Sequence, residues 1–153
     1  MSTARMWSFL MTCLSERKAF GRRIRQAFAL ALFALASSAL ALAAPFAYIT
    51  NFNSGDVSVI DTATKAVVAT VPVGVNPAGV AVTPDGAFVY VTHQNSGAVS
   101  VIASASNTVV ATVSVGSIPF GVAVTPYGAF VYVVNEGSGN VSVIASADNA
   151  VVA

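Results

Sequence analysis

Apolar and polar residues alternate in short runs along most of this chain. In the run 99–102, Val99 and Val101 alternate with Ser100, which predicts a strand with its valines toward a core and its serine outward. Further runs rich in Val, Ile, Thr, Phe and Tyr lie at 88–92, 109–115 and 121–125. No stretch after residue 44 combines helical spacing with helix-forming residues, so this part of the chain is predicted to be all-β.

Turn residues separate the predicted strands. Residues 94–98 contain Asn and Gly, and residues 103–107 are mostly small. In the segment 126–128, Pro126 fits a position with φ near −65° and Gly128 accepts a positive φ. These segments are therefore predicted to be hairpin turns, the last of them tight.

The predicted strands belong to a repeated unit. Tyr48, Tyr90 and Tyr132 are spaced 42 residues apart, and residues 48–89 match residues 90–131 at 28 of 42 positions without a gap. A third copy runs from Tyr132 to the last residue of the sequence. Four short strands in about 42 residues are typical of a β-propeller blade.

The phase of the repeat divides the chain into blades. If the Val-Ala-Val-Thr-Pro segment is the innermost strand, the blades fall at about 46–78, 79–120 and 121–153. The first blade then has strands at 46–51, 57–61 and 67–73 and lacks an inner strand. We predict eleven strands in all, as two four-stranded blades and a three-stranded partial blade.

So few blades cannot close a ring, which needs about four to eight. We therefore expect an open, C-terminally truncated propeller, the product of a longer gene or a partial sequence. A short protein that assembles by association is the alternative. In both cases the open blade faces are expected to favour self-association.

Three sets of residues resemble a known repeat. The segments 48–51, 90–93 and 132–135 look like the signature of the YVTN-family β-propeller, and 57–64 and 82–86 are similar to its other motifs. This chain departs from the pattern where Asp61 is replaced by Ala103 and Ala145, Asp85 by Tyr127, and Asn51 by His93. The family is known from archaeal surface layers and exported bacterial proteins, so the resemblance implies an exported binding or surface propeller and no defined reaction.

The first 43 residues have the order of a signal peptide. A basic cluster at 17–25 precedes an apolar run at 27–36, and Ala41-Leu42-Ala43 fits a cleavage site. We expect residues 1–43 to be removed and the mature protein, starting at Ala44, to be periplasmic, secreted or at the cell surface. An uncleaved membrane anchor over 27–44 is the alternative, and the Sec and twin-arginine routes both remain open.

Composition and charge exclude one class of protein and one class of partner. The chain is 56% apolar and 8% charged, which excludes an ordinary disordered protein. After Ala43, one base (Lys65) stands against five acids, so no nucleic-acid partner is expected.

The residues that carry most catalytic and metal chemistry are few. His93 is the only histidine and the part after residue 43 has no cysteine, so we predict a non-enzymatic protein with no metal and no cofactor. His93 stands where the other repeats have Asn, which favours a polar loop residue. Asp56 and Asp61 are predicted to stabilise turns.

For a protein predicted to have no enzymatic activity, binding is the function that we expect. Most differences between the first two repeats fall in three predicted loops, and loop variation on a constant scaffold is how propellers diversify recognition. In blade geometry two of these loops share a face with the corresponding residues of the third repeat. The candidate binding residues on it are Asn51, Asn53, Asn76, His93, Gln94, Asn95, Ile118, Phe120, Asn135 and Glu136.

The expected partner is a protein, a glycan or another envelope component, and a membrane is expected only through the N-terminal segment. Two other functions remain open. One is a propeller fragment of a periplasmic redox enzyme, whose cofactor ligands are not found in this sequence. The other is a structural surface-layer repeat.

Overall fold

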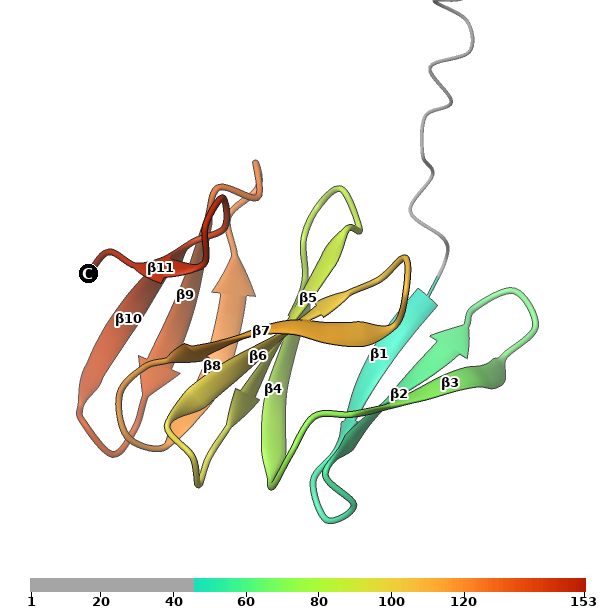
Figure 1. The fold of residues 1–153 in the computed structure, drawn as a ribbon, viewed down its shortest axis with the longest axis horizontal. Helices are drawn as coiled ribbons and strands as arrows, with labels where there is room; N and C mark the ends of the chain where they lie inside the picture. The colour runs from blue at the N-terminus through green and yellow to red at the C-terminus, as the bar shows by residue number, and fades with distance from the viewer. Residues whose placement is uncertain (1–45) are drawn as a thin grey trace, which may run out of the picture. The chain divides into compact units, whose positions relative to one another are not determined.

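Residues 46–153 are described by a computed structural model, and they form eleven strands without a helix (Figure 1). The first sheet contains β1 (Phe46–Asn51), β2 (Asp56–Asp61) and β3 (Ala66–Pro72). The second contains β4 (Pro77–Val82), β5 (Phe88–His93), β6 (Ala98–Ala103) and β7 (Thr108–Ser114). The third contains β8 (Pro119–Val124), β9 (Phe130–Asn135), β10 (Asn140–Ala145) and β11 (Ala150–Val151). The predicted all-β, incomplete propeller with its division of strands is confirmed; the predicted signal peptide and the Ala44 start lie outside the described residues.

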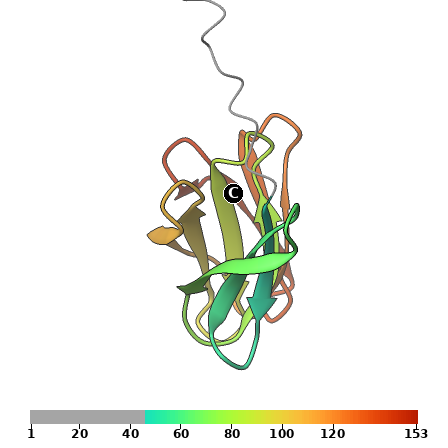
Figure 2. The ribbon, with the colours of Figure 1, turned by 90° about the vertical axis from the view of Figure 1, so that its right-hand side faces the viewer.

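Each sheet is an antiparallel meander in which every strand pairs with its neighbours in sequence. The three sheets stand side by side in chain order (Figure 1), and Figure 2 looks along this row with the first sheet in front. The inner strands β4 and β8 lie next to each other, and β1 lies next to β4. This is the arrangement of successive propeller blades.

Tight turns join the inner strands to their neighbours. Gly128 N–H donates to the Thr125 carbonyl at 2.8 Å, and Gly86 N–H donates to the Thr83 carbonyl at the same distance. Both glycines have a φ of 71°, a region that residues with a Cβ seldom adopt. The tight turn predicted at 126–128 is therefore confirmed, and the repeat uses it twice.

The second sheet is covered on both faces. Val99 and Val101 are fully buried, as predicted. Ser100, predicted to point outward, is also buried, with 2% of its surface exposed. The outward prediction was wrong because the first sheet covers the side of β6 that alternation assigns to solvent.

Two inner strands begin earlier than predicted. The sequence placed their starts at Gly79 and Gly121, whereas β4 begins at Pro77 and β8 at Pro119. Each proline is paired with the end of the next strand, and a register irregularity follows it. A proline has no N–H for the ladder but is tolerated as the first residue of a strand. Within residues 46–153, no helix exists that could span a membrane.

A candidate binding face at the strand ends

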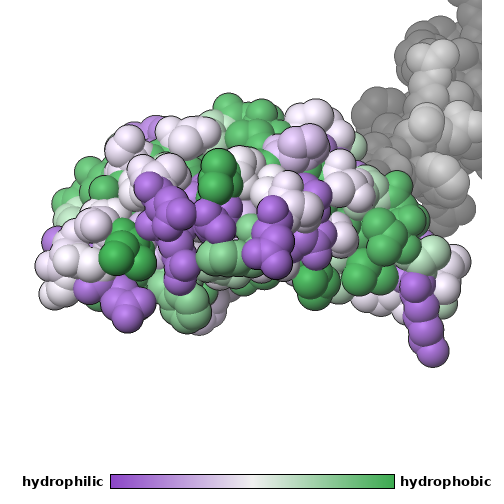
Figure 3. Space-filling view, turned by 90° about the horizontal axis from the view of Figure 1, so that it is seen from below, coloured by the Kyte–Doolittle hydropathy of each residue, from purple (hydrophilic) through white to green (hydrophobic). Residues whose placement is uncertain are grey.

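Two families of loops meet at one end of the sheets. We call this end the loop face; it comprises the β1–β2, β5–β6 and β9–β10 turns and the β3–β4 and β7–β8 connections. Val73 and Gly74 donate backbone hydrogen bonds to the Gly55 carbonyl at 3.0 and 3.1 Å, and Val115 donates to the Gly97 carbonyl at 2.9 Å. Figure 3 looks onto this face and shows polar groups interrupted by apolar ones.

The close approach of the two loop families depends on glycine. Gly55 has a φ of 75°, and a Cβ added there would lie 2.8 Å from the Gly74 carbonyl oxygen. A larger residue would therefore separate the β1–β2 turn from the β3–β4 connection.

Three predicted site residues occupy the same repeat position, the last residue of β1, β5 and β9. Asn135 Nδ2 donates to Asn140 Oδ1 and Ser142 Oγ, both at 2.9 Å. Asn51 Nδ2 donates in the same way to Asp56 Oδ1 at 2.6 Å and Ser58 Oγ at 2.8 Å.

His93 retains only half of that arrangement. Its Nε2 lies 2.8 Å from Ser100 Oγ, but Ala98 stands where the other sheets have Asp56 and Asn140. Within residues 46–153, Nδ1 has no partner with hydrogen-bond geometry. Burial lowers the pKa of His93 and so favours the neutral ring, and a backbone interaction with Val75 opposes that shift in part.

His93 and Asn135 are therefore not the loop residues that the sequence predicted. His93 is 3% exposed and Asn135 is fully buried. Both end a strand whose neighbouring sheet covers them. Of this set, Asn51 alone is half-buried.

A first hollow lies where the second sheet meets the β3–β4 connection. We call it the joint hollow; it has a volume of about 400 Å³. His93 and Ser100 line it on the second sheet, and Val75 lines it on the connection.

A second hollow lies across the β5–β6 turn from the first. We call it the turn hollow; its volume is about 580 Å³, and Gln94, Ser117 and Ile118 are among its lining residues. Asn95 and Ser96 line both hollows, so the tip of the β5–β6 turn separates them. Neither hollow is lined by Asp, Glu, Lys or Arg.

The structure brings three predicted residues into direct contact. Asn95 Nδ2 donates to Asn76 Oδ1 at 2.7 Å, and Gln94 N–H donates to the Asn76 carbonyl at 3.2 Å. Asn76 has a φ of 53°, which asparagine tolerates better than most residues.

Ile118 occupies the repeat position of Asn76 and has a φ of 51°. For a β-branched residue this is a strained conformation. Its carbonyl accepts a 3.0 Å hydrogen bond from Glu136 N–H, and its side chain packs so closely on Gly137 that an added Cβ there would lie 2.8 Å from Ile118 Cγ1.

The remaining predicted residues stand apart from the hollows. Asn53 and Glu136 are exposed on their turns, and Phe120 is 55% exposed on β8. Sequence reasoning missed Ser96 and Ser114, which line the turn hollow. Ser96 is identical to Ser54 in the first repeat, so a search for differences between repeats could not find it.

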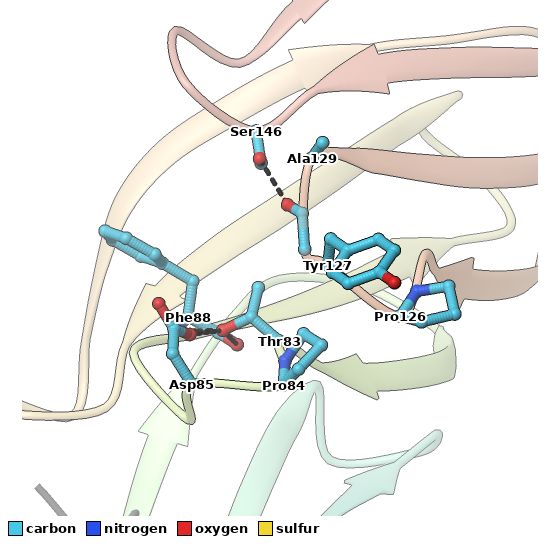
Figure 4. A pocket seen from close by; sticks show the side chains of 9 residues that line it. Thr83, Pro84, Asp85, Phe88, Pro126, Tyr127, Ala129 and Ser146 are labelled. Carbon is cyan, nitrogen blue, oxygen red and sulfur yellow. Dashed lines mark hydrogen bonds between the residues drawn. The ribbon is translucent and has the colours of Figure 1, made fainter. Parts of the chain in front are cut away.

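A third hollow, of about 500 Å³, lies at the opposite end between the two tight turns (Figure 4). Asp85 Oδ1 accepts hydrogen bonds from Thr83 Oγ1 at 2.6 Å and Ala87 N–H at 3.0 Å, and these bonds lower the pKa of Asp85. Tyr127, its counterpart in the third sheet, is 97% exposed. The Asp85 carboxylate therefore stabilises the tight turn between β4 and β5, in which it lies.

The other two acids named from the sequence also bond locally. Asp61 Oδ1 accepts hydrogen bonds from Ala63 N–H at 2.8 Å and Thr64 N–H at 3.0 Å, and Asp56 binds Asn51. The described part of the chain contains no group of three or more His, Cys, Asp or Glu side chains placed to hold a metal ion.

Solved propeller structures resemble this chain. Kuenenia stuttgartiensis hydrazine synthase is 33% identical, with a TM-score of 0.68 over 71% of this chain and 31% of that one. The dihydro-heme d1 dehydrogenase NirN in complex with DHE is 24% identical, with a TM-score of 0.64 over 72% of this chain and 24% of that one. A functionally unknown protein from Desulfotomaculum acetoxidans is 19% identical, with a TM-score of 0.60 over 71% of this chain and 37% of that one.

The chain thus spans between 24% and 37% of the length of these three solved chains. No curated protein matches its sequence. Residues 46–150 match the family described as Lactonase, 7-bladed beta-propeller, over nearly the whole of the three sheets. On that match and the blade arrangement of its strands, the chain belongs to this family of β-propellers.

Proposed function

We propose that this chain is a non-catalytic propeller module that binds a neutral glycan of the cell envelope at its loop face. The observation that carries the proposal is the pair of hollows on either side of Asn95 and Ser96, both lined without a charged side chain. A charged ligand would lack an opposite charge there, whereas a sugar needs amide and hydroxyl partners.

The polar groups around the turn suit sugar hydroxyls. The Asn95 and Gln94 amides supply both donors and acceptors, and Ser96 and Ser117 supply hydroxyls. In the joint hollow, Nδ1 of the His93 ring has no partner with hydrogen-bond geometry among the described residues. A ligand hydroxyl could satisfy that nitrogen, which is costly to leave unpaired in a buried position.

The proposal also states that the protein is exported and that its repeats are of the YVTN type. The segments 48–51, 90–93 and 132–135 support the YVTN type, and the basic and apolar segments before residue 43 support a leader. Together they favour a periplasmic, secreted or surface-bound protein, which would meet envelope glycans.

Calorimetric titration with chito-oligosaccharides, which are neutral, tests the binding. Replacing Asn95 and Ser96 together by Ala should weaken binding about tenfold, because two hydrogen-bonding side chains are lost. The matched control replaces Asn53 and Ser54, their counterparts in the first repeat, and should leave affinity unchanged. Equal weakening by both pairs, or no binding by the wild type, would reject this site.

A lactone-hydrolysis assay tests the non-catalytic part of the proposal, because the family description names lactonases. We expect the rate with the protein to equal the buffer rate. Hydrolysis that follows protein concentration and disappears in His93→Asn would establish an enzyme instead.

The second candidate function is that of a propeller segment of a redox enzyme. The similarity to hydrazine synthase and to the dehydrogenase NirN favours it. An absorbance spectrum of the purified protein separates the candidates: a haem or quinone band that co-purifies would support the redox function, and a spectrum of aromatic residues alone would support the binding module.

A further inference from the structure

The two contacts between neighbouring sheets use the same repeat positions. The first core cluster joins Tyr48, Val57, Val59 and Val71 of the first sheet to Val89, Val91 and Ile102 of the second. The second joins Tyr90, Val99, Val101 and Val113 of the second sheet to Val131, Val133 and Ile144 of the third. Each member of the second cluster lies 42 positions after its counterpart in the first. One interface is thus built twice.

Both halves of this interface recur on the outer faces of the first and third sheets, where no other sheet of residues 46–153 covers them. We call the outer surface of β9–β10, with Tyr132, Val141 and Val143, the tail face, and that of β1–β2, with Ala47, Ile49 and Ile60, the head face. Tyr132 is 44% exposed and Ile49 is 48% exposed, whereas their counterparts Tyr90 and Val91 in the second sheet are fully buried.

We propose that a second copy of this chain covers these surfaces, with the tail face of one copy packed on the head face of the next. The contact repeats what already joins the sheets within one copy, so it needs no new complementarity. It buries half-exposed apolar side chains, which is the dominant favourable contribution to association.

The polar part of the interface extends in the same way. Tyr90 Oη donates to Asn149 Oδ1 at 3.0 Å across the second and third sheets. Lys65 occupies the repeat position of Asn149 in the first sheet, and the two residues have similar φ values of 61° and 58°. In the assembly Lys65 takes the position of Asn149 opposite Tyr132, where the Lys65 ammonium can donate a hydrogen bond to the Tyr132 hydroxyl.

The number of copies follows from ring closure. A contact between two different faces forms either a ring or an open filament. Two copies bring together six of the sheets formed by residues 46–153, one fewer than the seven blades of the family description and within the range of about four to eight blades in closed propellers, whereas three copies bring nine. The expected assembly is a head-to-tail dimer.

Sedimentation velocity of the whole chain at micromolar concentration tests the proposal, with twice the monomer mass expected. Ile49→Asp and Val141→Asp should each raise the dissociation constant at least about a hundredfold, because each places an unpaired charge in the contact. Val110→Asp is the control, because Val110 is 53% exposed on the outer strand β7. Far-UV circular dichroism checks that each variant folds, and Ile49→Ser and Val141→Ser are milder replacements.

Mixing the two Asp variants gives the sharpest result. Each variant keeps one intact face, so an equimolar mixture should recover a dimer with one intact contact, although neither variant dimerises alone. A monomeric wild type, or a dimer that persists in Ile49→Asp, would overturn the proposal. If the wild type forms species larger than a dimer and either Asp variant abolishes them, ring closure by two copies is wrong.

Discussion

Tyr90 donates a 3.0 Å hydrogen bond from its hydroxyl to Asn149 Oδ1 and so fastens the second sheet to a turn of the third. The equivalent atoms one repeat earlier, Tyr48 Oη and Asn107 Oδ1, are both buried and neither has a hydrogen-bond partner within residues 46–153. Two sheet contacts of the same composition thus differ in whether this bond is formed.

Removing the two hydroxyls should have different effects on stability. Tyr90→Phe should lower the free energy of unfolding by about 1–2 kcal/mol, since it leaves the Asn149 oxygen without a partner. Tyr48→Phe should be neutral or slightly stabilising, because it removes a buried hydroxyl that has no hydrogen-bond partner among the described residues. Urea unfolding followed by tyrosine fluorescence measures both, and equal losses would contradict the difference between the contacts.

His93 should make the protein less stable as the pH falls below about 6.5. Burial lowers the pKa of His93 below 6.5 in the folded protein, so the folded state binds this proton more weakly than the unfolded chain. The stabilisation is complete above about pH 6.5, the unfolded-state value, and is lost progressively below it. The urea concentration at the unfolding midpoint should therefore decrease when the pH is lowered from 7.5 to 5.

The matched variant combines His93→Asn with Ala98→Asn and recreates the bonded pair Asn135–Asn140 in the second sheet. Its urea midpoint should change little over the same pH range, because it has no titrating group at this position. A wild-type midpoint that stays level from pH 7.5 to 5 would show that protonation of His93 does not oppose folding.

Gly79→Ala should destabilise the protein where the equivalent Gly121→Ala does not. A Cβ at Gly79 would collide with the carbonyl oxygen of Phe120 on the adjacent inner strand, whereas at Gly121 the nearest atom would be Val134 Cγ2 at 3.7 Å. We expect a loss of about 1–3 kcal/mol for Gly79→Ala and less than about 1 kcal/mol for Gly121→Ala. Thermal melts of the two variants measure the difference, and similar melting temperatures would argue against close packing of β4 on β8.

Ile118→Asn should stabilise the protein by about 1 kcal/mol. Asparagine occupies the same repeat position at Asn76 with a φ of 53°, so the substitution relieves the left-handed strain of a β-branched residue. Urea unfolding gives the stability. Because Ile118 lines the turn hollow, chito-oligosaccharide affinity should fall in the variant while stability rises. A less stable variant would mean that contacts of the Ile118 side chain outweigh the strain.

The sequence alone determined the number of strands, their grouping and the phase of the blades. The reason is that strand alternation and turn residues act locally, and the 42-residue period repeats them, so each repeat supports the assignment of the others. Pro126 and Gly128 specified their turn without any long-range contact. The division into blades also predicted that the turns after β1, β5 and β9 share a face with the β3–β4 and β7–β8 connections.

Only the tertiary structure decided which residues are accessible. Tyr90 and Tyr132 occupy the same position in nearly the same local sequence, yet Tyr90 is fully buried and Tyr132 is 44% exposed. His93 and Ser100 were misassigned to solvent for the same reason. Alternation along a strand says which side chains share a face, but whether a neighbouring sheet covers that face depends on residues about 40 positions away in the chain.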